Sequence, residues 1–430
     1  MKINHCSFVY ALALVPAVDA FAAENPNDIT FELHGTSRLT DNALRKPVDQ
    51  IEERQNEYGA GIDATYANDW TSLKANYDAS RFTFEHGSQE DRSILQGDTE
   101  VAFGNAYQPF GLLLTHSRRS LLNSPDAVDI ISNRNERDVL TAQPSAKWKI
   151  NDSDVLALTA DYSHVSYRYE GANDSNITGV NLAWQLGLSK VDTLVFSAEQ
   201  NSVKFEDASE FDYKHQNATV KYAVKLSNLS YAISVGANRA VLASESDTIT
   251  LPSFDVNIAY DTGINTFKFI ANRRITDTSM GDGNDTGLGV SPGDSLGQGI
   301  HLIDIRREEL SWATDAVCER CKLNLNAFDV SQQYHDSNQS YTEKGAGAGF
   351  NYRLTKAASF YVNASRSKRE FDPLSLRFDF TATRANVGFT YKFQNDLLLS
   401  IYRYQEKRNA DSFSDTYVEH YTGLSLSYSF

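Results

Sequence analysis

The last ten residues, YTGLSLSYSF at 421–430, alternate between two kinds of side chain. Leu424, Leu426, Tyr428 and Phe430 fall on one side of an extended strand, because successive side chains of a strand point to opposite faces. Glycine and serine residues fall on the other side. In a soluble sandwich the apolar side would pack on a core, whereas in an outer-membrane barrel it would contact lipid and the polar side would face a wet lumen.

The length of the chain bears on its fold, and its net charge bears on its partners. The chain has 430 residues and a net charge of -16, and no Pro/Gly-rich linker or change of composition divides it. A single large repetitive unit is therefore expected. The negative charge disfavours nucleic acid as a partner, because nucleic-acid binding selects basic patches.

The N-terminus has the pattern of a secretory signal peptide. Lys2 supplies the positive start, Phe8 to Val18 are mostly apolar, and Ala20-Phe21-Ala22 forms a small-x-small cleavage site. The apolar run reaches only about half of the ~20 residues that a spanning helix needs. We therefore expect residues 1–22 to be cleaved and residues 23–430 to form one domain.

Alternation of apolar and polar residues recurs along the whole mature chain, and no stretch has a convincing helical period. Short connections, such as 150–153 and 393–396, alternate with long polar ones, such as 122–137 and 278–300. The sequence therefore predicts an all-β fold: a single transmembrane antiparallel barrel of about 20 strands, within 18–22, with short periplasmic turns and longer extracellular loops in a Gram-negative outer membrane. Aromatic residues beside the short turns suit a girdle at the membrane interface: Tyr66, Trp70, Trp148, Trp184, Tyr260, Tyr352 and Phe393.

Two resemblances indicate which kind of outer-membrane protein to expect. The terminal Leu424, Leu426, Tyr428 and Phe430 resemble the signal that the barrel assembly machinery reads on outer-membrane proteins. The mature chain also resembles the β-barrel porins encoded with exopolysaccharide or exosortase-type systems, the EpsL-like group, in FELHGTSRLTDNALRKP (31–47), the stretch 57–85 and LTADYSHVSYRYEG (158–171). This second resemblance implies an outer-membrane channel or scaffold for exported polymer.

The alternation assigns charged residues of both signs to the lumen face, which suits a water-filled path for polar or charged solutes but equally suits paired charges that merely solvate the interior. The charged candidates are Asp63, Lys74, Asp78, Asp161, Lys221, Lys225, Asp255, Lys268, Arg353, Arg384 and Lys392. The acidic segments 50–57 and 88–91 are expected in outer loops.

CERC, from Cys318 to Cys321, is the sharpest motif, and the strand count places it in a short periplasmic turn. A disulfide is expected in that oxidising compartment. A haem site would need His after the second cysteine, where Lys322 stands, and a zinc site would need two further ligands. A redox role stays open, since barrels that sheathe multihaem electron conduits also carry a CxxC, although nearer the N-terminus.

Other chemical motifs are weak, so no cofactor, metal site or enzymatic activity is expected. The glycine-rich stretch 281–299 offers Asp282, Asn284 and Asp285 but lacks the closing Glu of a calcium loop. His116 and His164 have no partner nearby in the sequence that would mark a nucleophile–base pair.

Two functions follow from these observations. The first is a channel that passes exported exopolysaccharide or other polar solutes. The second is a plugged scaffold that holds a periplasmic partner, including a sheath for a multihaem conduit. The expected partners are outer-membrane lipid and lipopolysaccharide, the barrel assembly machinery, and either a polysaccharide or a periplasmic protein.

Overall fold

The computed structural model describes residues 27–104, 108–123, 127–169, 174–243, 248–277, 301–335 and 337–430. The expected signal peptide and the stretch 281–299 with its calcium-like pattern lie outside these ranges. Twenty strands form in chain order. They are β1 (Asp28–Thr40), β2 (Glu53–Ala67), β3 (Thr71–Phe84), β4 (Arg92–Phe103), β5 (Phe110–Leu122), β6 (Arg134–Lys149), β7 (Asp154–Tyr167), β8 (Ser175–Gly187), β9 (Asp192–Phe205), β10 (Tyr213–Lys225), β11 (Leu229–Leu242), β12 (Thr248–Asp261), β13 (Asn265–Asp277), β14 (Leu302–Thr314), β15 (Cys321–Tyr334), β16 (Tyr341–Arg353), β17 (Ala358–Phe371), β18 (Phe380–Lys392), β19 (Leu397–Ala410) and β20 (Tyr417–Ser429).

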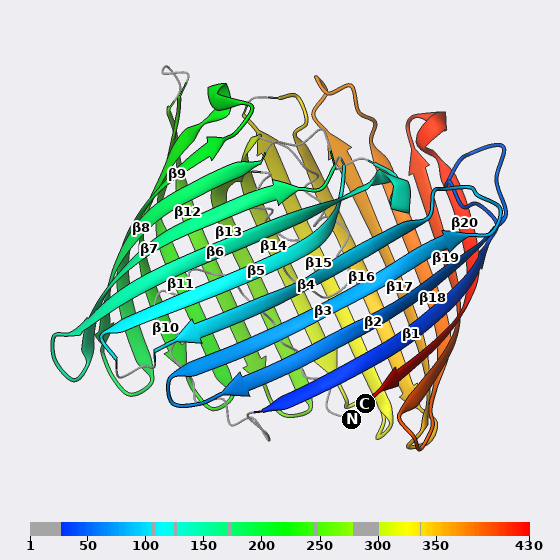
Figure 1. The fold of residues 1–430 in the computed structure, drawn as a ribbon, viewed down its shortest axis with the longest axis horizontal. Helices are drawn as coiled ribbons and strands as arrows, with labels where there is room; N and C mark the ends of the chain where they lie inside the picture. The colour runs from blue at the N-terminus through cyan, green and yellow to red at the C-terminus, as the bar shows by residue number, and fades with distance from the viewer. Residues whose placement is uncertain are drawn as a thin grey trace.

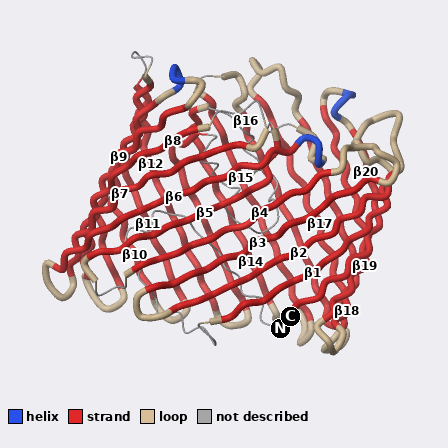
Figure 2. The backbone as a smooth tube through the Cα atoms, viewed as in Figure 1, coloured by secondary structure: helices blue, strands red, loops and turns tan. Residues whose placement is uncertain are grey.

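Each strand pairs antiparallel with the next, and the sheet closes on itself (Figures 1 and 2). The closing pair is β1 with β20, from Glu32↔Ser429 to Thr40↔Tyr421. Phe31 and Phe430 exchange both backbone hydrogen bonds at 2.9 Å beyond that ladder. Closure leaves no free sheet edge, which is the condition for strands to cross a bilayer. The predicted all-β barrel and its strand number are confirmed.

Helical structure is minor in the described chain. Three short 3-10 turns occur in the loops, at Ile131–Asn133, Ser209–Phe211 and Phe413–Asp415. Within the described ranges, no helix is both long enough and apolar enough to cross a membrane.

The two ends of the barrel differ in loop length, as predicted. The short connections, such as 68–70 and 226–228, lie at the end that holds Phe430, at the bottom of Figure 1. The long ones, such as 41–52 and 123–133, lie at the opposite end. We call these the periplasmic end and the outer end. One expectation was wrong: the acidic residues 53–57 begin β2 instead of lying in a loop, because Glu53 and Glu57 point to the inner face in phase with that strand.

The outer face of the barrel carries an apolar belt. Along β20, Leu424, Leu426 and Tyr428 are 46%, 43% and 39% exposed, and the serine residues between them point inward. Aromatic residues mark the periplasmic edge of the belt: Trp70, Trp148, Tyr260 and Phe393 are exposed, and Tyr260, Phe267 and Trp312 stack in a row. The terminal alternation quoted above is therefore that of a lipid-facing strand.

Two hairpins leave the wall at the outer end. The β4–β5 pairing stops at Gly97↔Arg118, although β5 and β6 remain paired as far as Leu122↔Arg134. Likewise, β12–β13 pairing stops at Phe254↔Arg273, while β13 and β14 remain paired to Asp277↔Leu302. The ends of both hairpins are thereby free to turn into the lumen.

Candidate functional site: the inner wall and its outer mouth

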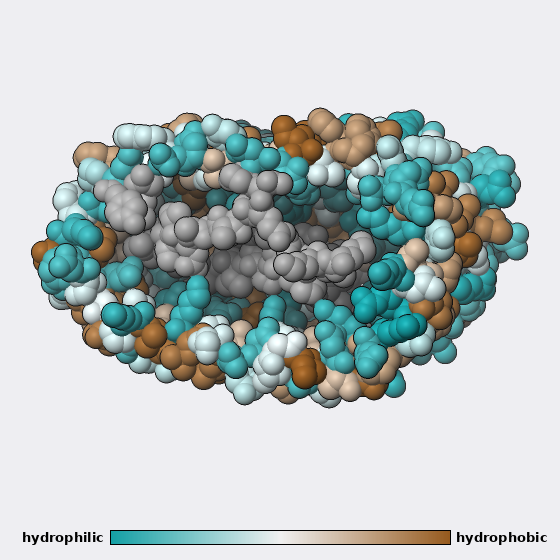
Figure 3. Space-filling view, turned by 90° about the horizontal axis from the view of Figure 1, so that it is seen from below, coloured by the Kyte–Doolittle hydropathy of each residue, from teal (hydrophilic) through white to brown (hydrophobic). Residues whose placement is uncertain are grey.

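The strand register places every charged lumen candidate on the face opposite the apolar belt. Asp63 opposes Asn76, Lys74 opposes Thr65, and Lys221 lies in one row with Ser234 and Asp255. Asp63, Lys225, Arg353 and Lys392 are exposed to solvent. Figure 3 views the barrel from the periplasmic end and shows its elongated outline, with hydrophilic residues along the inner edge of the wall.

The structure brings few of these candidates together. Asn76 donates a hydrogen bond to Asp63 at 3.0 Å, Asp78 lies 3.5 Å from His34, and Lys392 pairs with Asp396 in its own turn. The remaining candidates are spread around the wall. Arg384 alone among the eleven reaches the cluster at the outer mouth, where it pairs with Glu406 at 3.1 Å.

Tyrosines follow one side of the inner wall, on β17–β20. We call Tyr361, Tyr402, Tyr404, Tyr421 and Tyr417 the tyrosine track. Tyr404 and Tyr421 stack with ring centroids 4.6 Å apart, and Tyr402 meets Tyr421 edge-on at 6.1 Å. All except Tyr417 are partly accessible to solvent.

Two glycines make room for the rings of this track. One row across the sheet reads Tyr361, Gly388, Tyr402, Gly423. A Cβ atom at Gly388 would lie 2.4 Å from the Tyr361 ring, and one at Gly423 would lie 2.3 Å from the Tyr402 ring. The rings therefore lie over the glycines, along the wall. Arg38 from β1 donates to the Tyr402 hydroxyl at 3.2 Å and fixes that ring at the seam.

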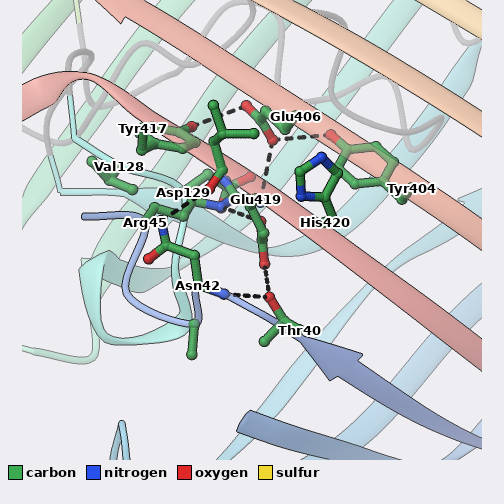
Figure 4. Close-up of polar contacts among 12 residues, drawn as sticks. Thr40, Asn42, Arg45, Val128, Asp129, Tyr404, Glu406, Tyr417, Glu419 and His420 are labelled. Atoms are coloured by element: carbon green, nitrogen blue, oxygen red, sulfur yellow. Dashed lines mark hydrogen bonds and ion pairs between the residues drawn. The ribbon is translucent and has the colours of Figure 1, made fainter. Parts of the chain in front are cut away.

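The loop 41–52 is bound to the same wall at the outer end (Figure 4). Its Arg45 donates to Glu419 at 2.7 Å and pairs with Glu406 at 3.2 Å. Glu406 also accepts hydrogen bonds from Tyr404 at 2.9 Å and Tyr417 at 3.1 Å. A buried carboxylate with this many donors is a strong anchor, because each remaining lone pair is satisfied.

Backbone and amide contacts hold the loop in register. Thr40 donates to Glu419 at 2.8 Å, and the Asn42 side chain donates to the carbonyls of Lys46 and Val418 at 2.7 and 3.0 Å. Arg45 adopts a positive φ of 52°, which non-glycine residues seldom adopt. Its ion pairs therefore offset a local backbone cost.

A second loop, 123–133, reaches this cluster from the far end of the β5–β6 hairpin. Figure 4 places Val128 and Asp129 beside Arg45. Burial alone would raise the pKa of Asp129, but Arg134 and Arg45 outweigh it and lower that pKa. Burial likewise lowers the pKa of Arg45, but the charges of Glu406 and Glu419 outweigh it and raise that pKa well above its usual value. Both groups are therefore ionised at neutral pH.

A third loop ties these two together. Gln89, between β3 and β4, accepts a hydrogen bond from the Ser132 amide at 3.0 Å and donates to the Ala43 carbonyl at 3.5 Å. Glu53 caps the same loop by accepting from the amides of His86 and Ser88. Loops from three hairpins thus form one hydrogen-bonded unit at the mouth.

Charge also fills the gap that opens between β4 and β5. Glu136, which is fully buried, pairs with Arg168 at 2.6 Å, Arg118 at 3.2 Å and Arg92 at 3.7 Å. Arg92 additionally donates to the carbonyls of Ile131 and Arg134. Arg92 on β4 and Arg168 after β7 thereby hold the displaced β5–β6 hairpin from either side, while Arg118 pairs within it.

The other displaced hairpin uses apolar contacts. Ile275 and Leu302, near the end of β13–β14, belong to a buried cluster with Val203 and Phe205, which point inward from β9. Tyr213 on β10 donates a hydrogen bond to Asp277. Because inward side chains of nearby strands contact it, the end of β13–β14 lies inside the lumen.

The remaining candidates of the sequence are placed as follows. Cys318, in the turn 315–320 at the periplasmic end, is disulfide-bonded to Cys321, the first residue of β15. His116 lies on the outer face, 2.5 Å from the Tyr77 hydroxyl and 3.3 Å from Asp138, and His164 lies 3.0 Å from Asn176. Within the described ranges, His, Cys, Asp and Glu side chains form no group of three or more that could hold a metal ion.

Sequence reasoning missed most of the mouth. Arg45 and Asp129 lie in loops, whose path the alternation does not define. Glu406, Glu419 and the tyrosine track were within reach, because counting back in twos from Ser429 reaches Tyr421, Glu419 and Tyr417 on the inner face. Extending the alternation toward the outer end of the last strands would have assigned these residues to the inner face.

Comparison with known proteins supports the fold. No known family model and no curated protein sequence matches the chain. Among solved structures, the siderophore receptor PirA from Acinetobacter baumannii aligns with a TM-score of 0.50 at 11% identity, over 94% of this chain and 81% of that one. The FrpB iron transporter from Neisseria meningitidis, F3-3 variant, gives 0.50 at 11% identity, over 94% and 82%. OccK1 (OpdK) of Pseudomonas aeruginosa gives 0.41 at 9% identity, over 94% and 98%.

These likenesses concern the fold. The closed sheet, the lipid-facing belt and the asymmetric loops define the chain as an outer-membrane β-barrel, and the two likenesses with a TM-score of 0.50 agree with that fold.

Proposed function

We propose that this barrel is a saccharide-handling channel, which passes exported exopolysaccharide or smaller polar solutes between the periplasm and the outside. The tyrosine track carries this proposal. Tyrosine combines an apolar ring face with a hydroxyl group, and a sugar ring likewise combines apolar C–H faces with hydroxyl groups. A row of partly accessible tyrosines from Tyr361 to Tyr404 along one wall offers successive stacking positions to such a chain.

The surroundings of the track support the same class of cargo. Asn363 and Asn386 point inward beside it, and Arg38, Glu57 and Arg384 add charged hydrogen-bonding groups. Polar groups around aromatic faces suit a hydroxyl-rich solute, because hydrogen bonds fix its orientation while stacking tolerates sliding. The resemblance to exopolysaccharide-linked barrels agrees with this choice.

The direct test is single-channel conductance of the mature protein in a planar bilayer, with neutral oligosaccharides added to either side. We expect a steady conductance that oligosaccharides interrupt. Tyr402→Ala together with Tyr404→Ala should weaken the block about thirtyfold, since each of the two stacking contacts contributes on the order of 1 kcal/mol. Tyr391→Ala, on the outer face, is the matched control and should leave the block unchanged. Conductance that is indifferent to sugars would contradict the proposal.

A plugged scaffold is the second candidate, and the packed end of β13–β14 favours it. Ile275 and Leu302 seal part of the lumen with apolar contacts, which a simple open pore would not need. Such a barrel would hold a periplasmic partner, including a sheathed multihaem conduit. Insertion without conductance, combined with copurification of a periplasmic protein, would favour this candidate over the channel.

We further propose that the protein acts in passage and not in catalysis, without a bound cofactor. Its partners would be the barrel assembly machinery, which would read Leu424, Leu426, Tyr428 and Phe430, the surrounding lipid and lipopolysaccharide, and the carried polysaccharide. Nucleic acid is not among the proposed partners, in keeping with the net charge of -16.

A further inference from the structure

The lipid-facing side of β7–β11 contains a hollow of about 700 Å³. Its rim is formed by Leu182, Trp184, Phe196, Val220 and Val235, which are all exposed on the outer face. The hollow exists because small residues replace large ones at its centre. Ala198 and Ala218 line it and stand in one row across β9 and β10, so the apolar surface is recessed between larger neighbours. Its volume lies within the range of ordinary ligand pockets.

The next row toward the outer end is polar. Gln200, Gln216 and Arg239 stand side by side on β9, β10 and β11, and Gln216 donates to Gln200 at 3.1 Å. Lys214 lies one step further along β10, and Lys204 is on the same outward face of β9. On the outer face of these strands, the apolar hollow is therefore directly followed by a group of cationic side chains.

These cations are not neutralised by the protein. Arg239, Lys214 and Lys204 are exposed, and within the described chain none of them forms an ion pair with a carboxylate. In contrast, Lys344 and Lys368, which also face outward, pair with Asp329 and Glu370. Outward cations without an ion pair also occur on β17 and β19 of the described chain, but those on β9–β11 border an apolar hollow. Charge complementarity therefore points to an anionic ligand from outside the chain.

We propose that this surface is a specific site for a phosphorylated, multiply acylated glycolipid of the outer leaflet. One acyl chain occupies the hollow over Ala198 and Ala218, and a phosphate of the headgroup is bound by Arg239, Lys214 and Lys204. Gln200 and Gln216 provide hydrogen bonds at the junction between headgroup and chain. The site is independent of the transport proposal, because it lies on the outer face and does not require a conducting lumen.

The test is native mass spectrometry of the full-length mature barrel, with purified bis-phosphorylated, hexa-acylated glycolipid added in mild detergent. Wild type should retain bound glycolipid. The triple variant Lys204→Gln, Lys214→Gln, Arg239→Gln should retain it about fivefold less or weaker still, as expected for loss of headgroup cations. Ala218→Phe fills the hollow without changing charge and should also reduce retention.

The chain supplies a matched control. Arg366, Arg403 and Lys407 are exposed outward-facing cations on β17 and β19 that form no ion pair with a carboxylate in the described chain, and they do not border the hollow. Replacing those three with Gln should leave retention near that of wild type. Equal loss in both triple variants, or no effect of Ala218→Phe, would overturn the site. Recovery of a lipid-free dimer that Ala218→Phe dissociates would also overturn it, and would assign the hollow to a second copy of the chain.

Discussion

The outer and periplasmic halves of the lumen are built from the same strands but hold their inward side chains differently. Near the outer end, Glu53, Glu343, Glu406 and Glu419 are at most 4% exposed. Near the periplasmic end, Asp63 and Arg353 are open to solvent. Among the described residues, loops and two displaced hairpins cover the outer half, whereas they leave inward side chains of the periplasmic half exposed. Charge is thus structural in one half and available to solutes in the other.

The difference follows from loop length. Turns such as 226–228 are too short to reach the lumen, while 41–52 and 123–133 are long enough to fold back onto the inner wall. Once a carboxylate is covered, it needs partners, because an unpaired buried charge is costly. Arg45 from the loop and Arg384 from the wall meet this need at Glu406.

Breaking the outer cluster should have the largest effect. Glu406→Ala removes the shared partner of Arg45, Arg384, Tyr404 and Tyr417, and should cost about 3 kcal/mol of unfolding free energy, as for a broken buried ion pair. Release of loop 41–52 should also raise the conductance. Urea unfolding followed by tyrosine fluorescence measures the first effect. Glu370→Ala, at an exposed outward pair, is the control and should cost less than about 1 kcal/mol.

The disulfide at the periplasmic end should matter less than the outer cluster. Cys318 and Cys321 close a very short loop, so the chain-entropy model gives at most about 2 kcal/mol for their bond. Cys318→Ser with Cys321→Ser should therefore lower stability slightly and leave conductance and sugar block unchanged. A loss of assembled barrel in the outer membrane, measured by heat-modifiable gel mobility, would contradict this purely local role.

Protonation should loosen the mouth only in acid. The pKa of Asp129 is lower in the folded protein than in the unfolded chain. Its ionised carboxylate therefore contributes fully to the stability of the mouth above the ordinary carboxyl pKa of about 4. That contribution is lost as the pH falls through the lower pKa of the folded state. Conductance should thus be constant from neutral pH to about pH 5 and rise below about pH 4. Asp129→Asn should show the raised conductance already at neutral pH. A transition near pH 6 in wild type would point to a different group.

Changing a charge in the periplasmic half should alter the ion selectivity of the channel and have little effect on the stability of the barrel. Lys221→Glu changes the charge of a wall position that none of the described loops covers, so unfolding free energy should change by less than about 0.5 kcal/mol. The reversal potential in a salt gradient should shift in the direction of greater selectivity for cations. Lys344→Glu, on the outer face, is the matched control and should leave the reversal potential unchanged.

The sequence was sufficient for the barrel but not for its mouth. Alternation at 421–430 and the two kinds of connection led to a closed barrel of about 20 strands, because period and turn length are local properties. The pairing of Arg45 with Glu406 and Glu419 joins the first connection, 41–52, to the last two strands, which are far apart from it in the chain. The ends of the β5–β6 and β13–β14 hairpins turn inward because their hydrogen bonding to the preceding strand stops early. No pattern in the local sequence predicts where that hydrogen bonding stops.

The most direct test of this two-part lumen is cysteine accessibility in the assembled barrel. Asn324→Cys lies on the inner wall of the periplasmic half, where the native side chain is exposed, and Asn238→Cys lies on the covered inner wall of the outer half, where the native side chain is 2% exposed. With a bulky water-soluble maleimide, Asn324→Cys should be labelled rapidly from the periplasmic side, and Asn238→Cys should stay unlabelled from both sides. Equal, rapid labelling of both cysteines would contradict a covered outer half and would require an open pore throughout.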